Sequence, residues 1–162
     1  MDDGHRLANH IARTITGPMW HGPALSELLK DVTPIDAAAR PIGQAHSIWE
    51  LVLHMAAWAE IARTRLSDKP TGEPTSAADW PPVTRLLAED WKTALTHLET
   101  SYRKLADEVT MFDGERLARI VPGRGYSVEE MLHGVIEHGT YHGGQIALLK
   151  RAIPALIGRQ DR

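Results

Sequence analysis

The sequence contains no cysteine. The chain therefore forms no disulfide bond and supplies no thiol nucleophile and no thiolate metal ligand. The lack of cysteine is compatible with a reducing compartment, and the polar residues 1–6 are not followed by the apolar core of a signal peptide. We therefore expect a cytoplasmic protein.

Long apolar runs and concentrations of basic charge are also missing. No apolar run reaches roughly 18 residues, the length of a membrane-spanning helix. The 18 Lys and Arg residues and the 21 Asp and Glu residues give a net charge of −3, and no basic stripe stands out. Neither a membrane nor nucleic acid is therefore an expected partner.

The sequence does contain the pattern of long amphipathic helices. Its 162 residues, 43% of them apolar and 24% charged, are enough for one domain with a hydrophobic core. We predict an all-α four-helix bundle spanning residues 1–162, in which Pro154 ends the last helix and residues 154–162 form a frayed tail. Apolar residues recur at spacings of three and four in the ranges 5–16, 47–66, 79–109 and 127–151.

The ends of these helices carry recognisable signals. Ser47 and Ser127 each precede a glutamate by three residues, which is the spacing of a capping box and marks the start of a helix. The polar connection 67–80 is long for a bundle, so it can carry the chain along the bundle and can also cover a site. In the connection 111–126, the alternation at residues 117–121 is typical of a short strand.

Nine histidines are more than a chain of this length normally has, and three of them replace apolar residues in helix stripes. His138 and His142 lie one turn apart in the fourth long helix, and His54 lies in the stripe of the second. The three imidazoles can therefore converge inside the bundle, where three protein ligands and an open position are typical of a catalytic metal site. The four-residue spacing alone is weakly specific, and the alternative is a set of hydrogen-bonded histidines in the core.

Two further side chains are candidates for catalysis. Glu50 precedes His54 by one turn, and Gln145 follows His142 by three residues. Glu50 can accept a hydrogen bond from a ligating histidine or act as a general base, and Gln145 can orient a water. The alternatives are a capping-box role for Glu50 and a helix–helix hydrogen bond for Gln145.

Small and aromatic residues accompany these positions. Gly139, Gly143 and Gly144 lie beside the histidine pair in a helix, where glycine costs about 1 kcal/mol relative to alanine. They indicate close approach of a neighbouring helix or room beside the metal. One or two of the five tryptophans are expected to line a pocket above the metal, because ligand sites are rich in aromatic side chains.

Two motifs of the chain resemble those of a known family. Residues 47–54, Ser-Ile-Trp-Glu-Leu-Val-Leu-His, and residues 138–146, His-Gly-Thr-Tyr-His-Gly-Gly-Gln-Ile, are similar to the histidine motifs of the DinB/YfiT-like superfamily of four-helix bundles. The linkers 20–23, 38–41 and 124–128 look similar too. The resemblance therefore covers nearly the whole chain, and the combination of the two motifs is specific.

This resemblance implies one divalent metal ion, usually nickel or zinc, on His54, His138 and His142, with water completing the shell. It also implies a homodimer formed through bundle faces. Relatives include thiol S-transferases, mycothiol-dependent isomerases and proteins assigned as hydrolases, so the implied substrate is a small molecule and the implied co-substrate a low-molecular-weight thiol. The shared chemistry is a metal that lowers the pKa of a thiol or water. The lack of cysteine agrees equally well with an external thiol and with water.

Three functions compete at this point. The first is a metal-dependent transferase of a low-molecular-weight thiol, or a related hydrolase. The second is a non-enzymatic dimeric metal-binding or stress-response module, whose metal is structural or whose pocket senses a ligand. The third is an inert bundle with buried histidines, in which apolar replacements of all three histidines leave the stability unchanged or improved.

Overall fold

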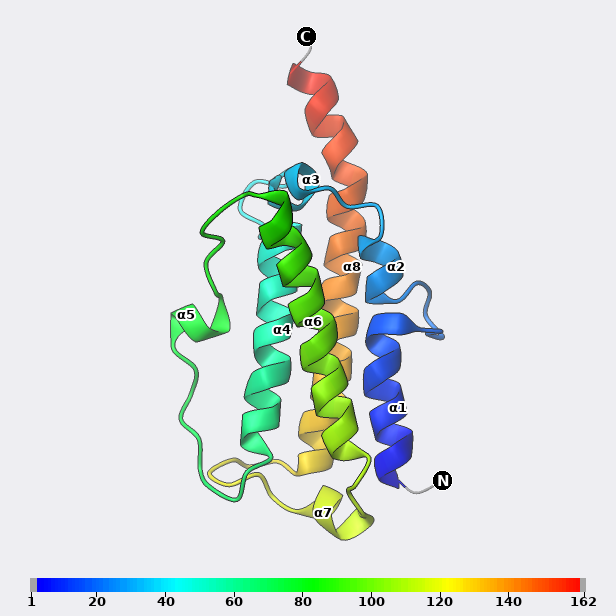
Figure 1. Ribbon diagram of the computed structural model, residues 1–162, viewed down its shortest axis with the longest axis vertical. Coiled ribbons are helices and arrows are strands. Elements are labelled where there is room, and N and C mark those ends of the chain that lie inside the picture. The colour runs from blue at the N-terminus through cyan, green and yellow to red at the C-terminus, as the bar shows by residue number, and fades with distance from the viewer. Residues whose placement is uncertain (1–2, 161–162) are drawn as a thin grey trace.

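The computed structural model describes the backbone of residues 3–160 and the side chains of residues 3–153. Within that range it contains eight helices and no strand, which confirms the predicted all-α fold. None of these helices combines the length and the apolarity needed to cross a membrane. Four long helices form the bundle (Figure 1): α1 (Asp3–Thr16), α4 (Ile48–Arg65), α6 (Ala88–Val109) and α8 (Val128–Gln160).

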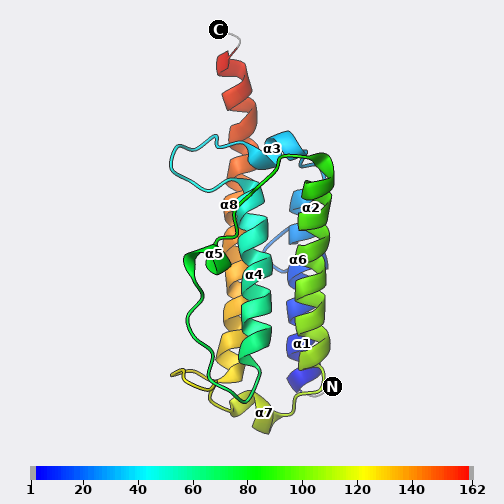
Figure 2. The ribbon, with the colours of Figure 1, turned by 60° about the vertical axis from the view of Figure 1, so that its left-hand side comes forward.

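The connections carry the short helices α2 (Leu25–Leu29), α3 (Pro34–Ala38), α5 (Ser76–Asp79) and α7 (Gly114–Ala118). In Figure 1, α1 and α8 run upward and α4 and α6 run downward, so the consecutive long helices α4 and α6 are parallel. The segment between them must return along the length of the bundle. It does so on the outside of α4 and carries α5, as Figures 1 and 2 show.

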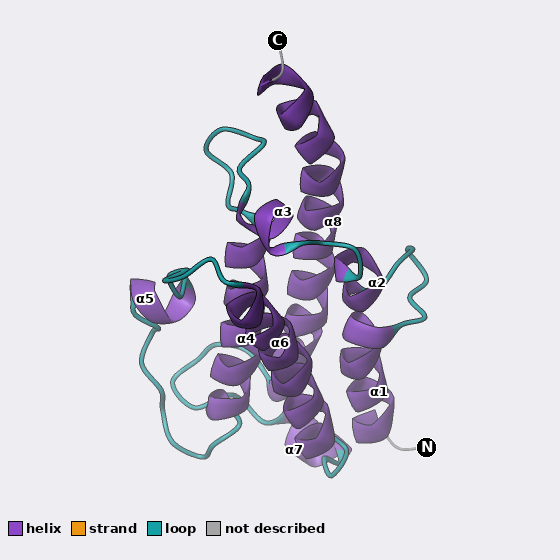
Figure 3. Cartoon of the chain, turned by 45° about the horizontal axis from the view of Figure 1, so that its top comes forward, coloured by secondary structure: helices purple, strands orange, loops and turns teal. Residues whose placement is uncertain are grey.

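Helices α4 and α8 pack directly against each other, and each also packs against one other long helix, α4 against α6 and α8 against α1. Helix α4 contacts α6 and α8, and α1 contacts the same two helices. Their apolar faces meet in one core, and burying each of its large aliphatic side chains stabilises the fold by roughly 1.5–3 kcal/mol. This core holds α4 beside α8 (Figure 3). Its fully buried members include Ile11, Val52, Leu98, Leu132 and Ile146.

Both predicted capping boxes are present, and they start the two helices that carry the histidine motifs. The Ser47 amide donates to the Glu50 carboxylate at 2.8 Å, and the Glu50 amide donates to the Ser47 hydroxyl at 3.3 Å. Ser127 and Glu130 make the same pair of bonds at 2.6 and 3.1 Å. Each box satisfies two amides that a helix start otherwise leaves without acceptors.

The third long helix begins later than the sequence pattern predicts. It starts at Ala88 instead of near Asp79, because Asp79 ends the short helix α5. Pro81 and Pro82 then keep the chain extended, since proline disfavours the helical conformation of the residue before it. Leu86 and Leu87 are consequently exposed and do not belong to the helix stripe.

Two further boundary predictions are wrong. The segment expected as a strand at 117–121 contains the end of α7, and only an isolated bridge between Ile120 and Ser127 is extended pairing. Helix α8 continues past Pro154 to Gln160, because a proline removes one intrahelical donor without necessarily ending the helix. The predicted frayed tail at 154–162 includes residues 161–162, which lie outside the described residues.

One of the three glycines beside the histidine pair in α8 marks a close helix contact. A methyl group built on Gly139 would lie 2.6 Å from Cγ2 of Thr14 and 2.9 Å from the hydroxyl of Tyr102. One built on Gly143 would make ordinary contacts with α2, and one on Gly144 would meet nothing. Close approach therefore explains Gly139, and Gly144 has open space around it.

We expect Gly139→Ala to lower the free energy of unfolding of the metal-free protein by about 1–3 kcal/mol, because α1 and α6 must move to admit the methyl group. Gly144→Ala is the matched control, and we expect it to be neutral or to stabilise by up to about 1 kcal/mol. Urea denaturation of both variants measures the difference. Equal stabilities would contradict the close packing at Gly139.

Candidate metal centre

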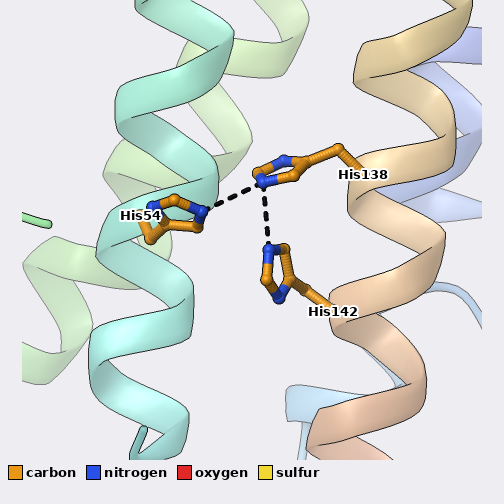
Figure 4. Close-up of side chains that lie close together, drawn as sticks. All are labelled: His54, His138 and His142. Atoms are coloured by element: carbon orange, nitrogen blue, oxygen red, sulfur yellow. Dashed lines mark hydrogen bonds between the residues drawn. The ribbon is translucent and has the colours of Figure 1, made fainter. Parts of the chain in front are cut away.

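The bundle brings three histidines together at the contact between α4 and α8 (Figure 4). The Nε2 atom of His138 lies 3.0 Å from Nε2 of His54 and 3.0 Å from Nε2 of His142. His54 and His142 are buried, with 5% and 6% of their surfaces exposed, and His138 is partly buried. The predicted convergence of the three imidazoles is therefore what the structure shows.

The tautomers of two of these histidines follow from their hydrogen bonds. His54 Nδ1 lies 2.7 Å from the backbone carbonyl oxygen of Asp79, and His142 Nδ1 lies 2.6 Å from Oε1 of Gln145. Both acceptors are carbonyl oxygens, so each Nδ1 must be the donor and carry the proton. When the rings of His54 and His142 are neutral, the Nε2 atom of each then directs a lone pair toward His138.

This arrangement is poorly satisfied as a set of hydrogen-bonded core histidines. A proton on Nε2 of His138 can make one good bond, although two lone pairs face it. Nδ1 of His138 is also buried and has no partner among the described residues. Three nitrogens at about 2.0–2.1 Å from one tetrahedral ion lie about 3.3 Å apart, close to the separations seen here. The three ligand atoms lie within 4.8 Å of one another and can hold a metal ion.

The protonation states suit this role. Burial, followed by the neighbouring His142 and His54, lowers the pKa of His138 to about 3. Burial is also the main reason why the pKa values of His54 and His142 are lowered, against the opposing effect of their hydrogen bonds. All three imidazoles are therefore neutral near pH 7, which is the form that binds metals.

The crossover segment covers one side of the cluster. Asp79, the last residue of α5, accepts a hydrogen bond from His54 through its backbone and one from Trp58 Nε1 through its carboxylate, at 2.7 Å. Trp80 stacks on the His54 ring, with centroids 3.7 Å apart and planes 8° apart, and His46 stacks on the other face of Trp80. The connection 67–80 therefore carries the chain along the bundle and covers the histidine cluster, as its length predicted.

Asp79 is a site residue that sequence reasoning missed. The residue was assigned to the start of the third long helix, and its proximity to His54 depends on the path of a loop. The only available signal was the unusual length of that loop. The structure shows that Asp79 holds the ring of His54 and tethers Trp58 at the same time.

The two candidate catalytic side chains, Gln145 and Glu50, differ in their distance from the histidine cluster: Gln145 contacts it and Glu50 lies at the start of α4. Gln145 contacts His142 through Oε1, and its Nε2 donates to the Tyr141 hydroxyl at 3.3 Å, which fixes the orientation of the amide. Glu50 is engaged at the helix start by Ser47 and by Arg40. The structure therefore places Gln145 against the His142 ring and gives Glu50 its alternative role, the capping box.

We expect Gln145→Ala to weaken metal binding by about ten- to hundredfold, because His142 loses the acceptor that holds its ring and tautomer. Gln145→Glu keeps an acceptor and should retain most of the affinity. Tyr141→Phe is the control, since it removes only the outer partner of the amide. Competition with a chromophoric chelator measures all three, and an unchanged affinity in Gln145→Ala would contradict this role.

A cavity of about 540 Å³ opens beside the cluster, between α4 and α8. His54 and His138 form part of its wall, so two of the three imidazoles are reachable from it. Trp58 lines it as well, in agreement with the expectation that one or two tryptophans line a pocket. The other lining residues are Ala62, Arg65, Asp79, Tyr126, Glu130, Met131, Gly134 and Val135.

Fold and site together define a helical bundle that carries a buried three-histidine group able to hold a metal ion. A family model described as the DinB superfamily matches residues 20–146, so the chain belongs to the DinB superfamily. This confirms the family that the two histidine motifs suggested. Searches of curated proteins and of solved structures gave no match.

Proposed function

We propose that the protein is a metal-dependent enzyme that transfers a low-molecular-weight thiol to a small molecule, or a related hydrolase. The observation that carries this proposal is the convergence of three Nε2 atoms beside a cavity large enough for a small molecule, with His54 and His138 in the cavity wall. A divalent ion, nickel or zinc, held by three imidazoles lowers the pKa of a thiol or water and supplies a nucleophile at neutral pH. With no cysteine in the chain, the thiol must come from outside.

The residues around the cluster suit this chemistry. Asp79 and Gln145 hold the rings of His54 and His142 with their Nε2 lone pairs directed inward. Trp80 covers the face of His54 and keeps water from it. Among the described residues, the ligand group contains three histidines and no carboxylate, which supports an open coordination position and favours catalysis over a structural metal.

The proposal is tested by screening the zinc- and nickel-loaded protein with an electrophile and several low-molecular-weight thiols. We expect thiol consumption that depends on the metal and is lost in His142→Ala. Ester substrates without thiol test the hydrolase reaction in parallel. Metal binding without turnover in either screen would favour the non-enzymatic metal-binding module. That the protein is a homodimer stays a prediction, which light scattering in solution tests.

A further inference from the structure

The cavity contains a second unusual group, the guanidinium of Arg65 in the last turn of α4. Only 7% of this side chain is exposed, and Arg65 is the only Lys, Arg, Asp or Glu that is buried among the described residues. It lines the same cavity as His54 and His138. A buried charge destabilises the fold unless it is closely paired, so the partners of Arg65 indicate the role of its guanidinium.

Those partners compensate the charge incompletely. Arg65 donates to the Tyr126 hydroxyl at 3.0 Å and to the Glu73 carboxylate at 3.3 Å, and its Nε is buried with no acceptor among the described residues. Glu73 is 71% exposed, lies in the crossover segment and is shared with Arg124. The single long contact between Arg65 and the exposed Glu73 carboxylate is weaker than the close bidentate pair that arginine can form with a carboxylate.

The guanidinium and the imidazoles lie at two ends of one apolar surface. The guanidinium carbon of Arg65 is 5.4 Å from the centroid of the Trp58 ring. That ring is 6.4 Å from the His54 centroid and 5.9 Å from the His138 centroid. Ala62, Met131 and Val135 also line this cavity. A ligand in contact with both ends therefore lies along Trp58.

The two acidic residues that line the cavity, Asp79 and Glu130, already have partners. Asp79 accepts from Trp58, and Glu130 accepts from the Ser127 amide at the start of α8. Within the part of the chain that the structure describes, Glu73 is the one carboxylate bonded to Arg65. An incoming carboxylate would thus compete with Glu73 for the guanidinium.

We propose that the cavity binds a small molecule that carries a carboxylate. Arg65 takes the carboxylate, Trp58 contacts an apolar middle, and the opposite end reaches the imidazoles of His54 and His138. Glu73 occupies the guanidinium in the absence of the ligand. The assignment of the reactive end rests on the proposed function, whereas the carboxylate end rests on Arg65 alone.

Two probes test this site by calorimetry: 6-mercaptohexanoate, and 6-mercaptohexanol, which replaces the carboxylate by a hydroxyl. We expect the zinc-loaded protein to bind the carboxylate about ten- to hundredfold more tightly, the range given by a hydrogen bond to a charged group. Arg65→Met should remove this preference and Arg65→Lys should restore part of it. Glu73→Gln should strengthen carboxylate binding several-fold by removing the competitor.

Arg63→Met is the matched control. It removes a cation from the same helix, but Arg63 is 44% exposed, lies 4.0 Å from Glu108 and does not line the cavity, so the preference should persist. Thermal unfolding shows whether Arg65→Met folds. If it does not, Glu73→Gln decides, and unchanged carboxylate binding there would overturn the site.

The metal-free protein separates this inference from the proposed function. The preference for the carboxylate should remain without zinc, while the contribution of the thiol should disappear. Equal binding of the two probes, no binding of either, or a preference that survives Arg65→Met would overturn the carboxylate site. If the carboxylate preference depends on Arg65 but 6-mercaptohexanoate binds equally well with and without zinc, only the activation of the thiol by the metal is overturned.

Discussion

Replacing His138 by alanine is expected to weaken divalent metal binding by more than about a hundredfold. His138 supplies the nitrogen that lies 3.0 Å from both other ligand atoms, so its loss leaves two imidazoles with no third neighbour. The expected effect exceeds the ten- to hundredfold that removal of a hydrogen-bond partner behind a ligand typically causes. Chelator competition with zinc and nickel measures it, and His133→Ala, on an exposed position of the same helix, is the control.

The same replacement should remove the stabilisation that the metal gives. An ion that binds only the folded chain stabilises it by about 2.7 kcal/mol at a hundred times its dissociation constant. We therefore expect added zinc to raise the melting temperature of the wild type and of His133→Ala, and not that of His138→Ala. If His138→Ala binds and responds to zinc like the wild type, the histidine cluster is not the metal site.

The second large effect is a loss of stability of the metal-free protein as the pH falls from 7 to 5. The pKa of His138 is lowered to about 3 in the folded chain, against an ordinary value near 6.5 when unfolded. Below pH 6.5 the unfolded chain takes up a proton that the folded chain does not, so acid favours unfolding. His138 alone should contribute roughly 2 kcal/mol over this range. His54 and His142 act in the same direction, because their pKa values are lowered too.

Urea denaturation at a series of pH values measures this effect, with His138→Phe as the variant that lacks the group. We expect the variant to lose less stability between pH 7 and pH 5 than the wild type. Parallel stability curves for the two proteins would show that His138 is not held neutral in the fold.

The sequence predicted those parts of the site that depend on helix geometry. His138 and His142 had to share a face because they are four residues apart, and the apolar stripe around His54 directed it to the same core. The capping boxes at Ser47 and Ser127 marked the starts of both helices. Local chemistry of this kind is readable from spacing alone.

The parts that the sequence did not predict depend on the path of the crossover segment. The apolar residues before Ala88 resemble the continuing stripe of α6, and Pro81 and Pro82 fit the start of a helix as well as an extended segment. Asp79 and Trp80 reach His54 because the segment folds back along α4 and forms α5 there. No sequence pattern sets Arg65 apart from other basic residues, and its burial against Glu73 of the crossover segment is a tertiary contact. Contacts of this kind are set by tertiary packing and have no periodic signature.

The inert bundle is the remaining alternative for the three histidines. It predicts that replacing all of them by apolar residues leaves the protein as stable as before or more stable, and that no metal stabilises the wild type. A metal centre also allows the metal-free triple variant to gain stability, since it removes buried imidazoles with competing lone pairs. Only the response of the wild type to metal separates the two accounts.

X-ray absorption spectroscopy of the zinc- or nickel-loaded protein tests the metal centre most directly. We expect one ion per chain, with three imidazole nitrogens at about 2.0–2.1 Å and at least one further light ligand that exchanges when a thiol is added. The thiol should appear as a sulfur at about 2.3 Å. Fewer than three imidazoles, or a shell completed by protein carboxylates, would contradict a three-histidine centre with an open position.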